Sequence, residues 1–343
     1  MRLSVIAVCA ALAGTCASLA ACEPSILKTE TDTPRLDAKR LDREMAAIAE
    51  RARPGVLGVA VMNLESGEFW TFNGDRPFPL GTTIGAPLAA VVLSELDAGR
   101  LSLDERIAIG GEDLSPPPSP MADAWPARSA YTVRELLAAA VGGADNTATD
   151  VLMKRIGGPG AVTGWLRLKN IDQVRVDRYE REIQPDIAGM ASFRQAWKGE
   201  PAFIRAMATV PPAARRAATE AFLRDPRDTA TPRGYLQLLM GLNDGVLLSK
   251  PSAALLLQVM TAQGETAGRL KAGLPAGARL AHEGGSGRDD QGRAPVTNDA
   301  GVITLRDNRR YAVAVFLSGS TLGEAERDAV IADVGRVVVQ GVR

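Results

Sequence analysis

Residues 78–99 read FPLGTTIGAPLAAVVLSELDAG, and the fold is best predicted from this stretch. A turn leads into an apolar run that ends at Gly99, a residue type common just after the C-terminus of a helix. The pattern predicts an apolar helix behind a short entry turn. We expect the rest of the chain to be organised around this helix, with an active site at the entry turn.

The composition is typical of a folded protein without a strong overall charge. The 343 residues are 46% hydrophobic and carry a formal net charge of zero, enough to build one large domain or two closely packed ones. Balanced charges give no field that attracts a polyanion, and Trp and Tyr are too few for base stacking. We therefore expect no nucleic-acid partner.

The N-terminus has the features of an export signal. Residues 1–21 contain one basic residue, a short apolar core and small residues before Cys22, and they are too short for a stable membrane span. The sequence Leu-Ala-Ala-Cys at 19–22 resembles a bacterial lipobox, which implies lipidation of Cys22, and residues 23–35 follow as a polar tether. We predict a periplasmic lipoprotein held on a membrane by its lipid; the alternative is an ordinary signal peptide with a chance cysteine.

Disulfides, metals and cofactors are not expected in the mature domain. The cysteines are Cys9, Cys16 and Cys22, all in or beside the signal segment, and His282 is the only histidine. The mature domain therefore lacks a thiolate nucleophile and the usual zinc ligands.

Hydrophobic periodicity predicts an α/β (α+β) fold with one antiparallel sheet built from both chain ends and helices between them. Residues 56–62 and 68–72 flank a Glu-Ser-Gly turn at 65–67 as a hairpin. We expect a sheet subdomain over 36–77 and 233–343, a helical subdomain over 78–232, and a surface loop at the Pro-rich residues 115–120. Further strands are expected at 278–283, 301–305 and 311–317, and helices at 36–52, 132–140, 147–156, 160–168, 190–197, 212–223, 234–244, 250–261 and 324–339.

Several short pieces, in this order, resemble the motifs of one enzyme family. They are residues 78–99, 131–137, 144–146, 156–159, 178–183, 227–232, 281–287, 298–299 and 326–332. In order and spacing the chain is similar to the class A serine β-lactamases, relatives of the penicillin-binding proteins, over essentially its whole mature length. The resemblance implies a β-lactamase-like fold, with an Ω-loop over 178–232 that is longer than expected.

The resemblance also assigns site residues, and several depart from the family pattern. The family uses Ser-x-x-Lys, Ser-Asp-Asn, a water-activating Glu and Lys-Thr-Gly. The resemblance makes Thr82 and Glu180 the catalytic candidates, and the binding candidates are Asp145, Asn146, Gln184, Glu283, Gly285 and Ser286. The departures are Thr82 for the nucleophilic Ser, Gly85 for its Lys, Ala144 for the second Ser, and Glu283-Gly284 for the Lys-Thr of Lys-Thr-Gly. Gln184 also replaces the Asn that usually partners the water-activating Glu.

These departures weaken acylation chemistry. A hydroxyl attacks only when a neighbouring base takes its proton, and Gly85 offers no side chain. Exchanging two lysines for Gly85 and Glu283 also turns attraction for an anionic substrate into repulsion, about 4 kcal/mol per charge pair at about 4 Å and an effective dielectric constant of about 20. Because Pro87 disfavours helical ψ at Ala86, we further predict that regular helix begins at or after Ala86.

Three functions stay open. The first is a monomeric pseudoenzyme that binds a β-lactam, a cell-wall-derived ligand or another envelope protein. The second is a surviving amide or ester hydrolase that uses Thr82 with Glu180, and the third is new acid–base chemistry from Glu180, Asp145 and Glu283.

Structural roles are the alternative for several of these residues. Glu180 would be a solvated carboxylate of the Ω-loop or an ion-pair partner of Arg178. Asp145 and Asn146 would hold a turn, and His282 would serve packing or hydrogen bonding. The 185–226 segment would be a lid, a partner surface or a tolerated insertion.

Overall fold

The computed structural model describes residues 35–262, 266 and 268–342. The predicted signal segment 1–21, the lipidation site Cys22 and nearly all of the tether lie outside these residues. Within the described part of the chain, no helix combines the length and apolar character needed to cross a membrane.

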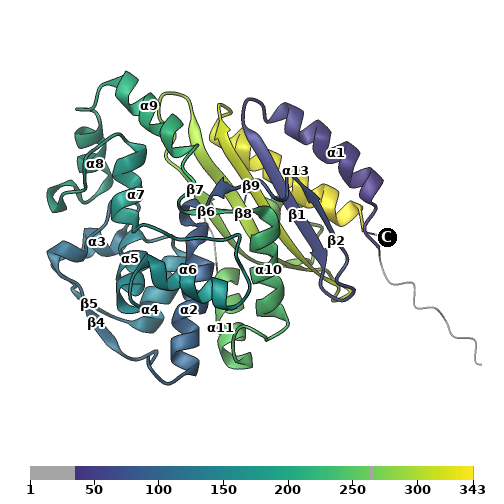
Figure 1. Cartoon of the computed structure of the whole chain (residues 1–343), viewed down its shortest axis with the longest axis horizontal. Helices are drawn as coiled ribbons and strands as arrows, with labels where there is room; N and C mark the ends of the chain where they lie inside the picture. The colour runs from purple at the N-terminus through teal and green to yellow at the C-terminus, as the bar shows by residue number, and fades with distance from the viewer. Residues whose placement is uncertain (1–34, 263–265, 267, 343) are drawn as a thin grey trace, which may run out of the picture. The chain divides into compact units, whose positions relative to one another are not determined.

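The described strands form a five-stranded antiparallel sheet with the order β2-β1-β9-β8-β7 (Figure 1). The predicted hairpin is confirmed, because β1 pairs with β2 in antiparallel register, Val59 opposite Phe72. β1 also pairs with β9, so the two ends of the domain share one sheet, as predicted. The bounds are β1 Val56–Asn63, β2 Phe69–Phe72, β7 Arg279–Ser286, β8 Ala294–Thr304 and β9 Arg310–Ser320.

Successive side chains of a strand point to opposite faces of the sheet, so the sheet lies between two hydrophobic cores. On one face, Val59, Val313 and their neighbours pack against α1 (Ala38–Arg51) and α13 (Glu324–Gln340). On the other face, smaller residues such as Ala60 and Ala314 join a core that continues into the helices. Because this second core is continuous, the subdomain boundaries at 77/78 and 232/233 stay a prediction.

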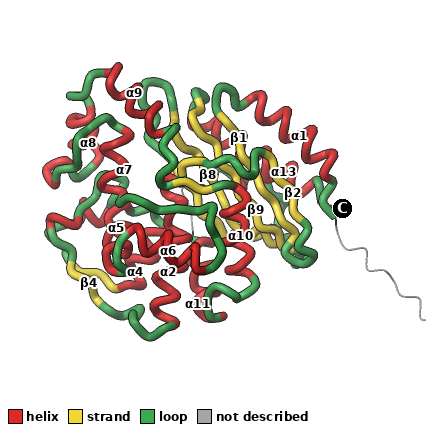
Figure 2. The backbone as a smooth tube through the Cα atoms, in the orientation of Figure 1, coloured by secondary structure: helices red, strands yellow, loops and turns green. Residues whose placement is uncertain are grey.

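The helix predicted from residues 78–99 is α2, Gly85–Asp97, and its residues from Gly85 to Leu93 are all buried. The other described helices are α3 Pro120–Ala124, α4 Val133–Leu137, α5 Asn146–Arg155, α6 Pro159–Leu168, α7 Glu180–Ile187, α8 Glu200–Met207, α9 Pro212–Phe222, α10 Pro232–Asn243, α11 Lys250–Thr261 and α12 Leu270–Gly273. In Figure 2, α5 and α6 lie beside α2 and α10 lies beside the sheet, whereas α8 lies away from both. Short strands pair β3 (Phe78–Pro79) with β6 (Thr229–Ala230) and β4 (Arg106–Ala108) with β5 (Ala130–Thr132).

Most predicted elements are confirmed to within a few residues, and three predictions are wrong. Only a 3-10 turn, Gln195–Trp197, forms within the helix expected at 190–197, where Arg194 has the extended backbone angles φ −123° and ψ 138°. The stretch after residue 178 is also more regular than expected, since it contains α7 and α8.

The Pro-rich loop is the third wrong prediction, because it is partly internal. Ser115, Pro116 and Pro117 are buried, whereas Pro118 and Pro120 are exposed. The loop packs on the start of α5: the Ser115 hydroxyl donates to Asp150, and the Asn146 amide donates to the Pro116 carbonyl.

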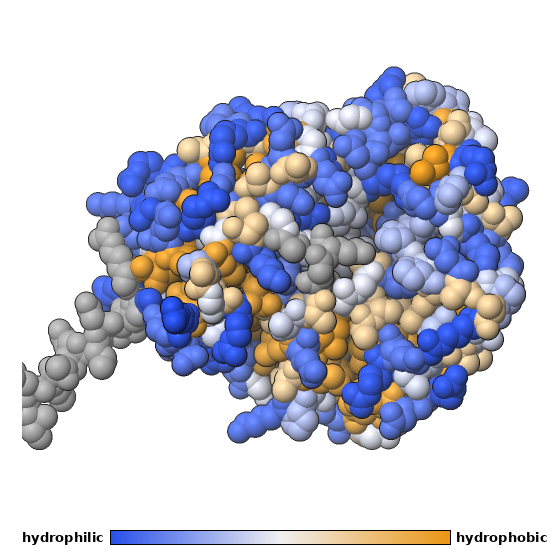
Figure 3. All heavy atoms as spheres, turned by 180° about the vertical axis from the view of Figure 1, so that it is seen from behind, coloured by the Kyte–Doolittle hydropathy of each residue, from blue (hydrophilic) through white to orange (hydrophobic). Residues whose placement is uncertain are grey.

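Hydrophilic side chains separate patches of hydrophobic ones on the face opposite that of Figure 1 (Figure 3). Over the described residues, the large hydrophobic side chains that stay exposed are Phe69, Leu168, Ile204 and Val246, and they come from different elements. Single exposed side chains of this kind are ordinary on a protein surface.

Candidate functional site

Thr82 lies in the 3-10 turn Gly81–Ile84, which joins β3 to α2. Its side chain is half-buried and its hydroxyl donates to the carbonyl of Gly284, at 3.3 Å, on β7. The α-helix begins at Gly85, so the prediction of a start at or after Ala86 is wrong by one residue. The entry turn is helical as well, with the tighter 3-10 geometry.

Pro87 still alters the start of α2. It has no N–H, so the carbonyl of Thr83, four residues earlier, loses its helical donor. That carbonyl instead accepts the hydroxyl of Tyr235, 2.9 Å away on α10. A side chain from α10 therefore replaces a missing helical hydrogen bond beside the candidate nucleophile.

Glu283 fills the space next to Gly85. Its Oε2 accepts the Ala86 N–H at 2.7 Å, and the Tyr235 hydroxyl lies 3.3 Å from the same oxygen. Its Oε1 lies 2.1 Å from the position that a Cβ on Gly85 would take, and the Ala140 carbonyl is 3.2 Å from that position. While Glu283 keeps this position, any side chain at residue 85 would collide with it.

Burial raises the pKa of Glu283 well above its ordinary value, although the Ala86 N–H opposes this shift. The raised pKa favours the neutral acid. The expected repulsion of an anionic ligand therefore weakens, and the loss of two attracting lysines becomes the larger effect.

Glu180 is the first residue of α7 and is 1% exposed. Its Oε2 accepts the Gln184 amide at 2.8 Å, one helical turn later, whereas its Oε1 has no hydrogen-bond partner among the described residues. Burial raises the pKa of Glu180 to about 7, against the effect of the Gln184 amide, and the nearby charges of Asp150 and Asp228 add to the rise. Such a carboxyl is suited to taking a proton near neutral pH.

Asp150 contributes to this site, although sequence reasoning did not single it out. Its carboxylate accepts the N–H groups of Glu180, at 2.6 Å, and Arg181, at 2.9 Å, and so caps the start of α7. Burial raises the pKa of Asp150 to about 6. The available signal was its position four residues after Asn146, on the same face of a predicted helix.

Asp145 and Asn146 hold the loop in front of α5. Asp145 caps α5 through the Ala148 N–H and also accepts the Met121 N–H, at 2.8 Å, and the Ser119 hydroxyl, at 2.9 Å. The Asn146 amide donates to the Pro116 carbonyl, and its Oδ1 is buried without a partner in the described part of the chain. These contacts match the structural role considered from the sequence.

Asp145, Glu180 and Glu283 therefore bond to different sets of groups. Their hydrogen bonds do not join them into a single acid–base cluster.

Gly285 and Ser286 end β7 beside the entry turn. A Cβ on Gly285 would lie 2.9 Å from the Thr83 nitrogen, so glycine allows the strand to approach the turn. Ser286 is exposed, and its hydroxyl accepts a hydrogen bond of 2.5 Å from Arg269. Arg269 is 3% exposed and was also missed from the sequence.

His282 has the structural role that we considered for it. Its Nδ1 lies 2.7 Å from Asp299 Oδ1, and both side chains are buried. Among the described residues, no group of His, Cys, Asp and Glu side chains is arranged to hold a metal ion.

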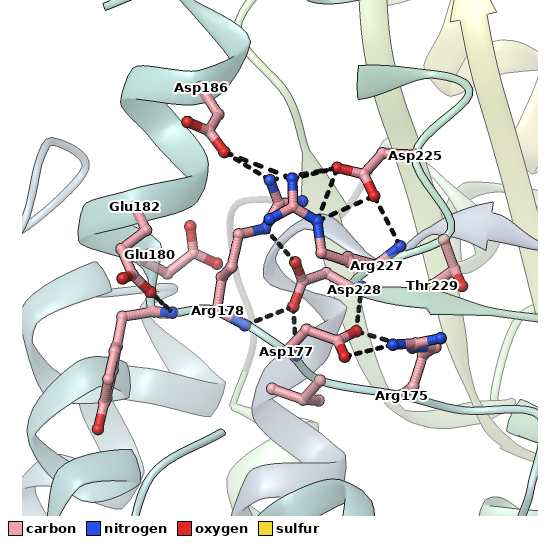
Figure 4. Close-up of polar contacts among 12 residues, drawn as sticks. Arg175, Asp177, Arg178, Glu180, Glu182, Asp186, Asp225, Arg227, Asp228 and Thr229 are labelled. Atoms are coloured by element: carbon pink, nitrogen blue, oxygen red, sulfur yellow. Dashed lines mark hydrogen bonds and ion pairs between the residues drawn. The ribbon is translucent and has the colours of Figure 1, made fainter. Parts of the chain in front are cut away.

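Arg178 closes the base of the extended Ω-loop (Figure 4). Its guanidinium pairs with Asp228 and Asp186, both at 2.6 Å, and with Asp225 at 3.4 Å. Asp228 also accepts the Arg178 N–H at 3.0 Å. The considered ion pair between Arg178 and Glu180 is therefore wrong, because Arg178 pairs with these aspartates and Glu180 bonds to Gln184.

A sheet made from both chain ends, a buried helix behind the candidate nucleophile and a closed Ω-loop together define a β-lactamase-like protein. Residues 40–342 match the model of the Beta-lactamase enzyme family. The chain belongs to that family and, in the order of its motif segments, is like the class A serine enzymes.

The curated relatives are β-lactamases, and the alignments cover most of both chains. The chain is 27% identical over 290 residues to β-lactamase VEB-1 of Pseudomonas aeruginosa, covering 84% of this chain and 85% of that protein. It is 26% identical over 296 residues to the extended-spectrum β-lactamase PER-1 of the same species, covering 84% and 83%.

Solved structures agree with this assignment. A β-lactamase from Chitinophaga pinensis has a TM-score of 0.71 and 32% identity, covering 87% of this chain and 97% of that one. An ancestral class A β-lactamase has a TM-score of 0.70 and 34% identity, covering 88% and 99%.

Proposed function

We propose that this member of the β-lactamase family has lost serine acylation and acts by binding, as a lipoprotein of the cell envelope. The observation that carries the proposal is the Glu283 carboxyl, whose Oε1 lies 2.1 Å from the place of a Cβ on Gly85. Residue 85 is glycine, so the base that family members place next to the nucleophile is missing, and the Glu283 carboxyl occupies its place. The Thr82 hydroxyl instead donates a hydrogen bond to the Gly284 carbonyl.

The ligand we propose is a β-lactam or a cell-wall-derived molecule, bound without a covalent step. Anionic groups would gain little at Gly85 and Glu283, where the family pattern has lysines. A neutral or weakly charged ligand therefore suits this part of the site better.

Intact mass after incubation with a penicillin tests the proposal, because it separates acylation from binding. We expect an unchanged mass and no hydrolysis of a chromogenic cephalosporin above the rate in buffer. A mass increase of one penicillin, mapped to Thr82, would overturn the proposal.

The second candidate is a hydrolase that uses Thr82 as nucleophile and Glu180 to activate water. The hydrogen bond between Glu180 and Gln184, at 2.8 Å, and the Glu180 pKa of about 7 favour it. This candidate requires that Thr82→Ala abolish any measured turnover. Absence of an adduct with any β-lactam, together with unchanged turnover in Thr82→Ala, would exclude it.

Placement in the envelope rests on the N-terminal residues. We propose that the signal 1–21 is removed, that Cys22 carries lipid and that the mature protein is a periplasmic monomer on a membrane. Cys22→Ser should move the protein from the membrane fraction to the soluble fraction. Equal membrane recovery of both proteins would contradict the anchor.

A further inference from the structure

The extended part of the Ω-loop, residues 191–223, contacts both the helical side and the sheet side of the candidate site around Thr82, the region called the cleft below. We call this segment the strap. It contains the 3-10 turn Gln195–Trp197 and the helices α8 and α9. In Figure 1, α9 lies near one end of the strands β7 and β8, and α8 lies toward α3.

On the helical side, the strap is held through Lys198. Its ammonium donates to the carbonyl of Ala122, at 3.2 Å, and to that of Trp125, and it lies 5.3 Å from the centre of the Trp125 ring. These residues belong to α3 and its end, and the Met121 N–H of α3 is bonded to Asp145. One attachment point is therefore the wall that carries Asp145.

On the sheet side, the strap is held by the turn between β7 and β8. Arg288 pairs with Glu200, with an Nη2 to Oε2 distance of 2.8 Å, and its guanidinium lies 5.7 Å from the centre of the Phe203 ring. Arg215 of α9 pairs with Asp290 at 3.0 Å. This turn follows Ser286 directly, so the second attachment point is the wall that carries Glu283 and Ser286.

The residues between these walls are largely shielded from solvent. Asp145 and Glu180 are each 1% exposed and Asn146 is fully buried, whereas Thr82 is half-buried. Because the strap is joined to both walls, it would limit the access of large molecules to Thr82.

We propose that the strap is a cover that spans the cleft and limits the size of the ligands that reach Thr82. Its polar attachments are ion pairs, the hydrogen bonds of Lys198 and two cation–aromatic contacts, and the Glu200 side chain is 49% exposed. Phe203 and Ala206 of α8 also pack into the core shared by the helices. A partly exposed pair such as Arg288–Glu200 contributes about 0–1 kcal/mol, so loosening this end of the strap costs less than global unfolding. The strap is thus closed in this structure, and its polar ends are its weakest attachments.

The test uses a single thiol at the candidate nucleophile. The full chain carries Thr82→Cys together with Cys9→Ser, Cys16→Ser and Cys22→Ser, so position 82 holds its only cysteine. Labelling rates are measured with iodoacetamide, a small reagent, and with a bulky polyethylene glycol maleimide. We expect Lys198→Ala, and separately Arg215→Ala combined with Arg288→Ala, to speed labelling by the bulky reagent about tenfold and to change the iodoacetamide rate little.

Arg205→Ala is the matched control, because Arg205 is an exposed arginine of α8. It should leave both rates unchanged. Equal bulky-reagent rates in the strap variants, Arg205→Ala and the parent would overturn the proposal.

Salt provides a second measurement if a strap variant fails to fold, which would accelerate both reagents alike. About 1 M NaCl shortens the Debye length to about 3 Å and weakens the ion pairs of the strap. In the parent thiol protein, salt should then speed the bulky reagent selectively, and a salt-independent ratio of the two rates would also overturn the proposal. The inference rests on the proposed function only in treating the cleft as the binding site. Thiol labelling needs no ligand. It can therefore disprove the cover while the intact-mass experiment still supports binding, and the reverse also holds.

Discussion

Glu283 and Gly85 are complementary, because the space left by one side chain is occupied by the other. The Glu283 carboxyl sits at the N-terminal end of α2 and accepts a backbone N–H there, a favourable place for an acidic oxygen. Its Oε1 leaves no room for a Cβ at residue 85. The two departures from the family pattern are thus one local rearrangement.

Gly85→Ala should destabilise the protein by about 1–3 kcal/mol, because overpacking outweighs the better helix propensity of alanine. The free energy of unfolding in urea measures this effect. Glu283→Ala in the same chain should remove most of the penalty, since it deletes the colliding oxygen. Additive effects of the two substitutions would contradict the steric coupling.

Glu180→Gln should stabilise the protein more at pH 8 than at pH 5. Burial raises the folded-state pKa of Glu180 from 4.5 to about 7, so its contribution to stability is fully present below about pH 4.5 and is lost as the pH rises through about 7. The glutamine variant avoids this loss, which is on the order of 3 kcal/mol.

Urea unfolding of the variant and the parent at both pH values measures this difference. Glu182→Gln, an exposed carboxyl of the same helix, is the control. A Glu180→Gln effect of equal size at pH 5 and pH 8 would show that the carboxyl does not titrate in this window.

The Ω-loop is longer than expected and contains the helices α8 and α9. Arg178 and Asp228 join its two ends, and Arg175 pairs with Asp177 at 2.5 Å beside them. With the base closed, the longer middle part can fold into α8 and α9 without displacing α7. Insertions between such fixed ends cost little additional loop entropy.

Arg178→Ala should destabilise the protein by about 3–5 kcal/mol, because it leaves the buried carboxyl of Asp228 without its cation. Urea unfolding measures the loss, and limited proteolysis should show faster cleavage within residues 191–223. Arg309→Ala removes a local surface pair with Asp307 and should have little effect. Unchanged stability of Arg178→Ala would mean that the loop is closed by other contacts.

At the scale of the whole molecule, the β-lactamase fold persists although the motif residues for acylation are replaced. The sheet, the buried helix α2 and the continuous core are made by apolar side chains, and most site residues do not contribute to that core. Fold and chemistry are therefore separable in this protein.

Restoring four of the changed motif positions should therefore restore acylation. We expect the combined variant Thr82→Ser, Gly85→Lys, Ala144→Ser and Glu283→Lys to form a penicillin adduct at least about 100-fold faster than Thr82→Ser alone, because nucleophile and base act as a unit. Intact mass measures the adduct, and circular dichroism checks the fold. A folded combined variant without an adduct would show that further parts of the site have changed.

Much of the fold follows from residue patterns, whereas the site follows only in part. The hairpin around residues 65–67, the strands near the C-terminus and the capping box of Thr132 and Glu135 are local signals, and the structure has all of them. The missed helix α7 is capped by Asp150 of α5, a partner distant in sequence. The contacts of Tyr235 and Arg269 are likewise made between elements that no local pattern connects.

The residue types at 82, 85, 144 and 283 already indicate, without coordinates, a β-lactamase relative with altered motif residues, because motif order and hydrophobic periodicity are properties of the chain. Packing alone decided how those changes fit together. It placed the Glu283 oxygen where a side chain at residue 85 would stand, and it joined the strap to both walls of the cleft. These contacts link residues far apart in the chain, so they exist only once the folded elements have come together.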